Sequence, residues 1–328
     1  MYLQDDFSEL ARCLMLGRGN LEDTRREAGG ASARVRAILA KADPGSVGGI
    51  GSPSWGGELS DYALVAESFI SSLRNVGVFD RVAADAVQLP MKSRVAVAAS
   101  ATTGDGVSEA EPKIVTQLEL ANGQLDVMKC AATVVVTAEL LRLGGENAMR
   151  LMMNELRSAT VAATDSQFIF GLDAMTSSAI ASTGDVLADL RAMMLAVKSG
   201  SASRFFLVVT PDDAKVVATL SGTHGGTAFS SMTPQGGVIA GVNVMTSDHV
   251  APGAALFLDA AQLAVSVGTV ALSASTQATV TMSETDLTSL WQRNMTGLRG
   301  ERFFSFEPLR ATATAALTGV DWSPGSPA

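Results

Sequence analysis

Two histidines are the residues of this chain whose side chains most readily bind a metal or act as a general base near neutral pH. A metal site or a catalytic pair on one helical face needs a histidine, a cysteine or a carboxylate three or four positions away, and neither His224 nor His249 has one. Asp248 adjoins His249, but adjacent side chains do not face each other on a helix or a strand. Both histidines are therefore expected to be loop residues, and no metal site is predicted.

Paired carboxylates and thiols are the next candidates for chemistry. Asp212 and Asp213 follow Thr210 and a proline, a pattern that predicts a helix start, and the helix macrodipole favours acids in a first turn. Cys13 and Cys130 stand alone, without the spacing of a metal site. We expect reduced packing residues in a cytoplasmic setting, with a disulfide or a reactive thiol as the alternative.

Motifs for nucleotide binding and nucleophilic catalysis are absent. The sequence contains no P-loop, no G-x-G-x-x-G and no G-x-S-x-G, and the glycine-rich run at residues 48–51 belongs to a flexible segment. We therefore expect no cofactor and no enzymatic activity. An enzyme with an unrecognised site remains the least favoured hypothesis.

The composition favours a protein that is partly covered by its own copies. Charged residues make up 17% of the 328 residues, below the roughly 25% of an ordinary soluble domain, and hydrophobic residues make up 47%. The length corresponds to about two domains. The net charge of −9 argues against a basic surface for nucleic acid or anionic membranes. The most apolar stretch, Ala254 to Leu272, contains Asp259, and the acidic N-terminus lacks a basic signal-peptide start, so neither a membrane span nor a secretory signal is expected.

The stretch from Thr133 to Leu172 organises the chain. A β-branched run and a Gly-Gly break precede a helical pattern from Glu146 to Phe170, about 25 residues or roughly 37 Å at the usual rise. The predicted apolar stripe comprises Met149, Met152, Leu156, Ala159, Ala163 and Phe170. The residues expected elsewhere on the helix are Arg150, Asn154, Arg157, Thr160 and Thr164.

The N-terminal segment is expected to be helical and to end at a linker. Two helices are predicted, around Phe7–Leu16 and around Leu21–Lys41, the second interrupted at Gly29 and Gly30. The Gly-, Pro- and Ser-rich segment 43–57 reads as a linker in which Trp55 is a lone anchor. The helices before it form either a small appendage or an arm that lies across a neighbouring subunit.

A long hairpin is predicted after a helix at Leu59–Val76. Its strands are Ser93–Ser100 and Ile114–Leu120, joined through a turn-rich segment at residues 101–106. The charged tip contains Glu109, Glu111 and Lys113. A hairpin with so few large apolar residues cannot form its own core, so it must pack against another part of the assembly. A neighbouring subunit is the obvious candidate.

The remaining elements predict a second, α/β domain. A strand at Met128–Thr137 leads into the long helix, with Cys130, Ala132, Val134 and Val136 on one face. The later elements are a helix from Thr183 or Asp185 to Lys198, a strand at Phe205–Val209, a helix capped by Thr210, a loop at Gly222–Gly237, and strands at Val238–Met245, Ala255–Asp259 and Leu263–Val267.

Three short motifs carry a resemblance to a known family. Thr137–Leu141 reads Thr-Ala-Glu-Leu-Leu at the end of a strand; Asp165, Phe168 and Gly171 form an Asp-x-x-Phe-x-x-Gly motif; and Asn294 and Arg299 form an Asn-x-x-x-x-Arg motif. In this order and spacing the motifs resemble the major capsid protein of tailed bacteriophages, over roughly residues 59–322.

The resemblance implies an α+β fold of the Hong-Kong-97 type. The expected parts are an N-terminal arm and linker (1–57), a peripheral domain (58–88 and 118–182, with the long helix as its spine), an extended hairpin loop (89–117), an axial α/β domain (183–267), and return strands with a C-terminal tail (268–328). The residues expected at contacts between subunits are Trp55, Arg94, Glu109, Glu111 and Lys113. The hairpin lacks the tryptophan of many family members, and no covalent crosslink through Lys113 is predicted.

The implied function is a structural one. Copies would form hexamers and pentamers of an icosahedral virion shell, assembled in the host bacterial cytoplasm around double-stranded DNA without sequence-specific contacts. Portal and scaffolding or decoration proteins are the expected partners, and no membrane is involved. An encapsulin-like compartment that holds cargo enzymes is the alternative. Whether Met1 is the original start or follows removal of a scaffolding segment stays open.

Overall fold

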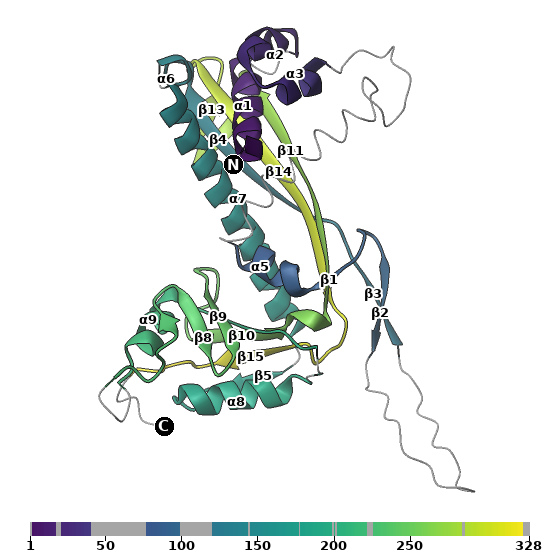
Figure 1. Ribbon diagram of the computed structural model, residues 1–328, viewed down its shortest axis with the longest axis vertical. Coiled ribbons are helices and arrows are strands. Elements are labelled where there is room, and N and C mark those ends of the chain that lie inside the picture. Colours follow the sequence, from purple (N-terminus) through teal and green to yellow (C-terminus); the bar gives the residue numbers. More distant parts are fainter. Residues whose placement is uncertain are drawn as a thin grey trace, which may run out of the picture. The chain divides into compact units, whose positions relative to one another are not determined.

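The computed structural model describes residues 2–17, 21–40, 77–98, 120–143, 145–176, 178–198, 200, 202–221, 226–283 and 286–323 (Figure 1). The chain divides into two compact units. The first unit comprises Met1–Gly77, Lys129–Thr164 and Gly268–Phe303, and the second unit comprises Val78–Met128, Asp165–Val267 and Phe304–Ala328. The predicted linker at 43–57 and the predicted helix at Leu59–Val76 lie outside the described residues.

The N-terminal segment is a small bundle of helices with its own core. Its elements are α1 (Tyr2–Leu16), α2 (Leu21–Glu27), the short 3₁₀ helix η1 (Ala28–Gly30) and α3 (Ala33–Ala40). The predicted interruption at Gly29 and Gly30 is confirmed, because η1 ends there and α3 begins three residues later. Apolar side chains of α1, η1 and α3 are buried, namely Leu10, Met15, Ala28, Val35 and Leu39.

A four-stranded sheet and the helix α7 (Gly145–Met175) form the framework of the chain. The strand order is β1 (Val87–Gln88), β11 (Leu263–Ser275), β14 (Met295–Pro308) and β4 (Met128–Thr137). Within the first unit α7 lies against β4 and β14: the Cys130 thiol donates a hydrogen bond to the Ala163 carbonyl at 3.2 Å, and a Cβ on Gly300 would lie 3.5 Å from Leu156. The predicted bounds of β4 are confirmed.

The predicted apolar stripe of α7 is only partly right. Met152 and Leu156 are buried, but Ala159 and Phe170 are exposed and Ala163 is half-buried. The helix is also six residues longer than expected, since it has 31 residues. The buried positions follow steps of four, through Met152, Leu156, Thr160, Thr164, Phe168 and Leu172.

Two threonines expected on the other face of α7 are therefore buried. Each hydroxyl donates to the carbonyl four residues earlier at 2.7 Å, Thr160 to Leu156 and Thr164 to Thr160. These bonds give each buried hydroxyl a partner within α7 itself, so the threonine methyl groups can pack in the core.

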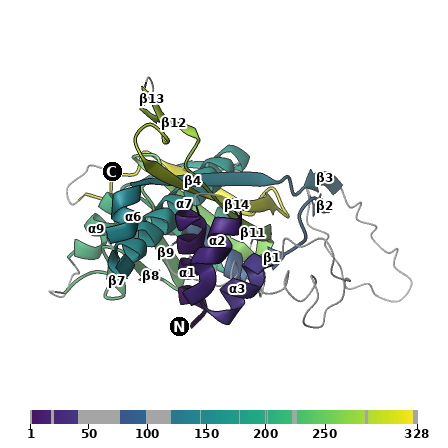
Figure 2. The ribbon, with the colours of Figure 1, turned by 90° about the horizontal axis from the view of Figure 1, so that it is seen from above.

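A separate hairpin completes the first unit. Strands β12 (Thr279–Ser283) and β13 (Asp286–Ser289) pair antiparallel. Figure 2 shows this hairpin apart from β4 and β14. Leu290, directly after β13, is buried, whereas Leu287 and Trp291 are exposed.

The second unit contains a seven-stranded mixed sheet. Its strand order is β5 (Ala179–Ala181), β15 (Thr314–Thr318), β10 (Ala254–Asp259), β6 (Phe205–Val209), β9 (Val242–Thr246), β8 (Gly236–Ile239) and β7 (Met232–Thr233). The helices α8 (Val186–Ala196) and α9 (Pro211–Thr219) share one hydrophobic core with it, and Figure 1 shows α8 running along the sheet. Core members include Leu190, Met193, Ala214, Val217, Leu207, Val244, Phe257 and Leu317.

Both helix starts in this unit agree with the prediction, α8 with the second of its two alternatives. Asp185 caps α8 by accepting a hydrogen bond from the Leu187 amide at 3.1 Å. Thr210 caps α9 by accepting from the Asp213 amide at 3.1 Å, with Pro211 as the first helical residue. The two aspartates of α9 therefore belong to its first turn, as expected.

The single strand predicted at Val238–Met245 is wrong. Ala240 and Gly241 both have positive φ, 49° and 83°, and this two-residue turn folds the segment back on itself as β8 and β9. The loop predicted at Gly222–Gly237 is also partly wrong, because β7 and the start of β8 fall inside it; residues 222–225 lie outside the described part.

The predicted strand at Leu263–Val267 belongs to a different sheet. It is the start of β11, which continues to Ser275 and pairs in parallel with β1 rather than with the seven-stranded sheet. The preceding 3₁₀ turn η2 (Ala260–Gln262) separates β10 from β11, and buried Asp259 caps it. The Asp259 carboxylate accepts from the Ser203 hydroxyl and the Arg204 amide at 2.6 and 2.8 Å, so its burial is compensated.

The long hairpin has a different return strand from the predicted one. Strand β2 (Arg94–Ala98) pairs antiparallel with β3 (Leu120–Gln124), with Arg94 opposite Gln124 and Ala98 opposite Leu120. Of the predicted return strand Ile114–Leu120 only Leu120 is described, and the predicted turn at 101–106 is outside the described residues. Both strands consist mainly of small residues, so their side chains do little to fix which residues pair. This explains why the return strand lies later in the sequence than predicted.

None of the described helices combines the length and the apolar character that a membrane crossing requires.

Candidate functional site

The residues predicted at subunit contacts are described at one position only. Arg94 begins β2 and is exposed. Trp55, Glu109, Glu111 and Lys113 lie outside the described residues, as does His224. His249 lies in a turn after β9, where its amide donates to the Ser247 hydroxyl at 3.3 Å.

The Asp-x-x-Phe-x-x-Gly motif forms a joint between α7 and α5 (Val78–Asp85) in the second unit. The Asp165 carboxylate accepts hydrogen bonds from the Val78 and Phe79 amides, both at 2.9 Å. These amides belong to the first turn of α5, where backbone donors lack partners inside the helix. Asp165 therefore caps a helix that lies 86 residues earlier in the sequence, and it is itself buried.

Phe168 and Gly171 complete the joint through a cluster of phenylalanines. The Phe168 ring meets Phe79 edge-on at a centroid distance of 5.2 Å and Phe306 at 4.9 Å. Phe79 also contacts Phe304 at 4.9 Å. A Cβ on Gly171 would lie 2.5 Å from the Phe306 ring, so only glycine allows the ring to approach this turn of α7.

Replacing Gly171 with alanine is expected to destabilise the subunit by about 1–2 kcal/mol. Overpacking a core costs about 1–3 kcal/mol, and the higher helix propensity of alanine offsets up to about 1 kcal/mol of it. Urea unfolding of the purified subunit measures the change. Gly300→Ala is the control, because its Cβ would meet Leu156 at an ordinary 3.5 Å. A Gly171→Ala subunit as stable as the parent would contradict the joint.

The other two motifs meet in the first unit. Thr137 accepts a hydrogen bond from the Leu140 amide at 3.3 Å and so caps α6 (Ala138–Leu143), while the Ala138 amide donates to the Asn294 carbonyl at 2.9 Å. Asn294 has a φ of 51°, a left-handed conformation that asparagine tolerates. The strand end that starts α6 is thus tied to the turn that precedes β14.

Arg299 is part of a charged row across the sheet. Glu301 accepts from Lys129 at 2.8 Å and from Arg299 at 3.2 Å. The hydrogen bond from Lys129 is the largest influence and lowers the pKa of Glu301; desolvation opposes it, and the charges of Arg299 and Lys129 add to the lowering. The three motifs therefore hold secondary structure together, and none of them presents an arrangement for catalysis.

A buried carboxylate that the sequence analysis missed anchors the C-terminal segment. Asp189 of α8 accepts from the Thr183 amide and hydroxyl, both at 2.7 Å, and from the Trp322 indole at 2.9 Å. The Ser182 hydroxyl also donates to it at 2.5 Å. An aspartate on the apolar face of a helix, four residues after a capping aspartate, was the available signal.

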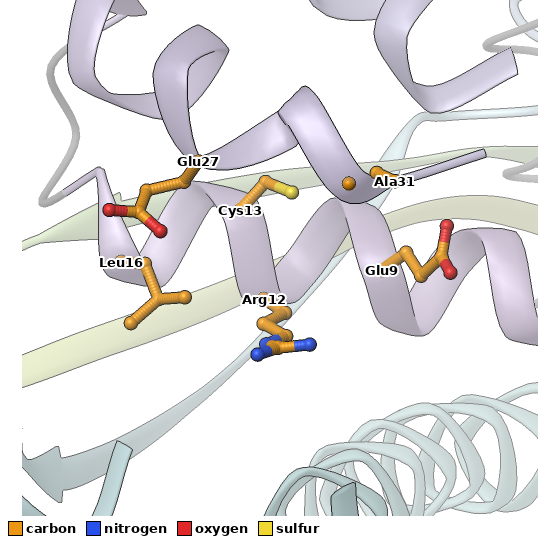
Figure 3. A pocket seen from close by; sticks show the side chains of 7 residues that line it. Glu9, Arg12, Cys13, Leu16, Glu27 and Ala31 are labelled. Carbon is orange, nitrogen blue, oxygen red and sulfur yellow. The ribbon is translucent and has the colours of Figure 1, made fainter. Parts of the chain in front are cut away.

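The helical bundle at the N-terminus contains a pocket of about 170 Å³. Glu9, Arg12, Cys13, Leu16 and Glu27 line it together with Gly30 and Ala31. Figure 3 shows the first four on α1, Glu27 at the end of α2 and Ala31 just after η1. Burial, and next the charge of Glu9, raise the pKa of the Cys13 thiol, so it stays protonated and weakly nucleophilic at neutral pH. Cys130 is likewise a free, buried thiol whose pKa burial raises, so both predicted packing cysteines are confirmed.

The described residues offer no metal centre. They contain no group of three histidine, cysteine, aspartate or glutamate side chains that could hold an ion.

Known proteins resemble the chain along most of its length. It is 28% identical over 308 residues to the "Capsid polyprotein" of Pseudomonas phage PAJU2, an alignment that covers 82% of this chain and 46% of the relative. The chain thus spans about half the length of that curated relative.

Solved structures share the fold. A chain of Gordonia phage Cozz superposes with a TM-score of 0.53 at 15% identity, covering 72% of this chain and 85% of the other. A chain of Mycobacterium phage Bobi gives 0.53 at 16% identity, with 75% and 90% covered. A chain described as the capsid of a native GTA particle gives 0.51 at 12% identity, with 77% and 91% covered.

The family match extends over most of the chain. The model of the phage capsid family matches residues 64–319, which include the three motifs, the joint at Asp165 and the seven-stranded sheet. The mixed α+β fold is accordingly of the Hong-Kong-97 type. The family is structural and not enzymatic. The chain belongs to the phage capsid family.

Proposed function

We propose that copies of this chain build the icosahedral shell that encloses the double-stranded DNA genome of a tailed phage. The observation that carries the proposal is the family match over residues 64–319, joined by structural likeness to phage chains across about three quarters of the sequence. Repeated contacts between copies would stabilise the shell, and closed symmetry would limit its growth.

The parts of the subunit are assigned by analogy with the family. In this proposal residues 1–57 are an N-terminal arm and linker, 58–88 and 118–182 the peripheral domain, 89–117 the extended hairpin loop, 183–267 the axial domain, and 268–328 the return strands and tail. The N-terminal bundle supports a folded helical module at the tip of the arm, because its helices bury side chains against one another.

The hairpin is proposed to contact a neighbouring subunit. Among the described residues β2 and β3 pair only with each other, and a two-stranded ribbon of small residues is not stable alone. A neighbour would supply the missing support. Trp55, Arg94, Glu109, Glu111 and Lys113 are the side chains we assign to such contacts.

Hexamers and pentamers are the proposed building blocks of the shell. Portal and scaffolding or decoration proteins are the proposed additional partners. The net charge of −9 fits DNA that is enclosed without sequence-specific contacts.

Electron microscopy of the purified protein at high concentration, with and without a scaffolding protein, tests the proposal. Shells are expected. Monomers alone, together with the absence of the chain from any phage particle, would refute it, and shells that hold a cargo enzyme in place of DNA would support the encapsulin-like alternative.

Reversing the charges of Glu109 and Glu111 together is expected to reduce shell formation while the subunit stays folded, because so charged a sequence at the hairpin tip is expected to add nothing to a hydrophobic core. Circular dichroism checks folding and microscopy counts shells. Lys215→Glu, at an exposed position of α9, is a control for altered surface charge. Loss of the circular-dichroism signal in the double variant would contradict the assignment of the tip.

A further inference from the structure

The outer face of α8 carries an arginine between two exposed leucines. Leu187 is 53% exposed and Leu195 is 76% exposed, and Arg191 lies one helical turn from each. The opposite face of the helix is fixed in the core through Leu190 and Met193. The two leucines on this outer face therefore lie outside the core that fixes α8.

A second exposed apolar side chain lies on the last turns of α7. Phe170 is 78% exposed, although Phe168 and Gly171 beside it point into the joint. Asp173, three residues on, is also exposed and lies on the same side of the helix. In the described part of the second unit, Phe170 and Leu195 are the two most exposed large hydrophobic side chains.

We propose that the α8 face of one subunit docks on the Phe170–Asp173 surface of the next copy. This inference deepens the proposed shell function and rests on it. Asp173 would pair with Arg191, and Phe170 would pack on Leu195. Phe170 and Asp173 are three residues apart on α7, and Leu195 and Arg191 are four apart on α8. Because either spacing puts the two Cβ atoms about 5–6 Å apart on a helix, both contacts can form at once.

Charge complementarity identifies the second copy as the occupant. The α8 surface combines leucines with a cation, and the α7 surface combines an aromatic ring with an anion. Within the described residues, neither Arg191 nor Asp173 forms an ion pair in the single subunit. Apolar neighbours would exclude water from the new ion pair and strengthen it.

Two different surfaces on each copy also give the geometry of a ring. A contact between unlike surfaces is heterologous, so each subunit binds one neighbour through α8 and the other through α7, and rotation closes the ring. This is the arrangement that a hexamer or a pentamer requires.

A charge swap tests the contact. Arg191→Glu and Asp173→Arg, each alone, are expected to raise the protein concentration needed for half-assembly about tenfold, which corresponds to about 1.4 kcal/mol. The double variant restores assembly because the pair is re-formed with reversed charges. Lys215→Glu, on α9, changes the net charge by the same amount as Arg191→Glu and should assemble as the parent does.

Engineered cysteines test the apolar part of the contact. Phe170→Cys and Leu195→Cys subunits, mixed after separate purification, are expected to form a disulfide-linked dimer under mild oxidation, and the double variant a ladder of crosslinked rings. Leu195→Cys mixed with Leu287→Cys is the control, since Leu287 is 72% exposed in the first unit.

The outcomes separate the two hypotheses. If the parent forms shells but the single charge variants assemble equally well, or the swap fails to restore assembly, the docking surface is wrong and the shell function stands. Shells without crosslinks between Phe170→Cys and Leu195→Cys would reject it too. If the parent forms no assembly at all, the shell function fails, and the docking surface fails with it.

Discussion

Replacing Phe168 with alanine is expected to lower the free energy of unfolding of the subunit by about 3–5 kcal/mol, the range for truncating a buried phenylalanine. Phe168 is 0% exposed, and its ring contacts Phe79 and Phe306 edge-on. Its loss would leave a cavity in the cluster that fixes α5 on α7. A loss this large is a substantial part of the 5–15 kcal/mol of a typical domain.

Phe170 provides a matched control two residues away on the same helix. It is 78% exposed, so Phe170→Ala is expected to change the free energy of unfolding by less than about 0.5 kcal/mol. Urea unfolding of the disassembled subunits, followed by circular dichroism, measures both variants. Equal losses would show that the faces of α7 are assigned wrongly.

The contrast between Phe168 and Phe170 shows what the periodicity of α7 did not reveal. The predicted stripe reached Phe170 through steps of three, four or seven between apolar residues and left out Phe168, and it placed Thr160 elsewhere on the helix. A threonine inside a helix can satisfy its hydroxyl on the carbonyl four residues earlier, so its polarity does not decide its face. The exposure of Phe170 has no such local signal, because nothing in its immediate sequence separates it from Phe168.

Signals that act within a few residues were predicted correctly. Thr210 before a proline, Asp185 before α8 and the β-branched run of β4 each depend on neighbours in sequence. The Ala240 turn was missed because its sequence, Ala-Gly, is not one of the usual signals for a two-residue hairpin.

Contacts between segments that are distant in the sequence could not be predicted from the sequence. The Asp-x-x-Phe-x-x-Gly motif was found, but nothing in it shows that Asp165 caps α5, since a cap is normally local in sequence. The register of β2 and β3 was missed because it depends on a hydrophobic face that this hairpin lacks. For the candidate contact residues only Arg94 could be placed, and their role stays a prediction.

Replacing Asp189 with asparagine is expected to cost about 2–4 kcal/mol and to loosen the C-terminal segment. The carboxylate is 1% exposed and accepts hydrogen bonds from Thr183 and Trp322, each worth about 1.5–3 kcal/mol when the acceptor is charged. Asparagine removes the charge and turns an amide toward these donors. Fluorescence of Trp322 during urea unfolding follows the loss, provided Trp55 and Trp291 are replaced by phenylalanine in both proteins.

The lowered pKa of Asp189 determines in which direction the stability of the subunit changes with pH. Burial raises the pKa of Asp189, but the hydrogen bonds from Ser182, Thr183 and Trp322 outweigh burial and hold the pKa below the ordinary 3.8. A carboxylate whose pKa is lowered by folding stabilises the fold fully above its ordinary pKa, and the stabilisation is lost as the pH falls toward the folded value. The gap in stability between the parent and Asp189→Asn should therefore stay constant from pH 7 to about 5 and narrow below about 4. Asp185→Asn is the control, because asparagine caps a helix as well as aspartate does, and it should change stability little at any of these pH values. A gap that widens as the pH falls would show that Asp189 is protonated in the folded subunit and would overturn this account of how the C-terminal segment is held.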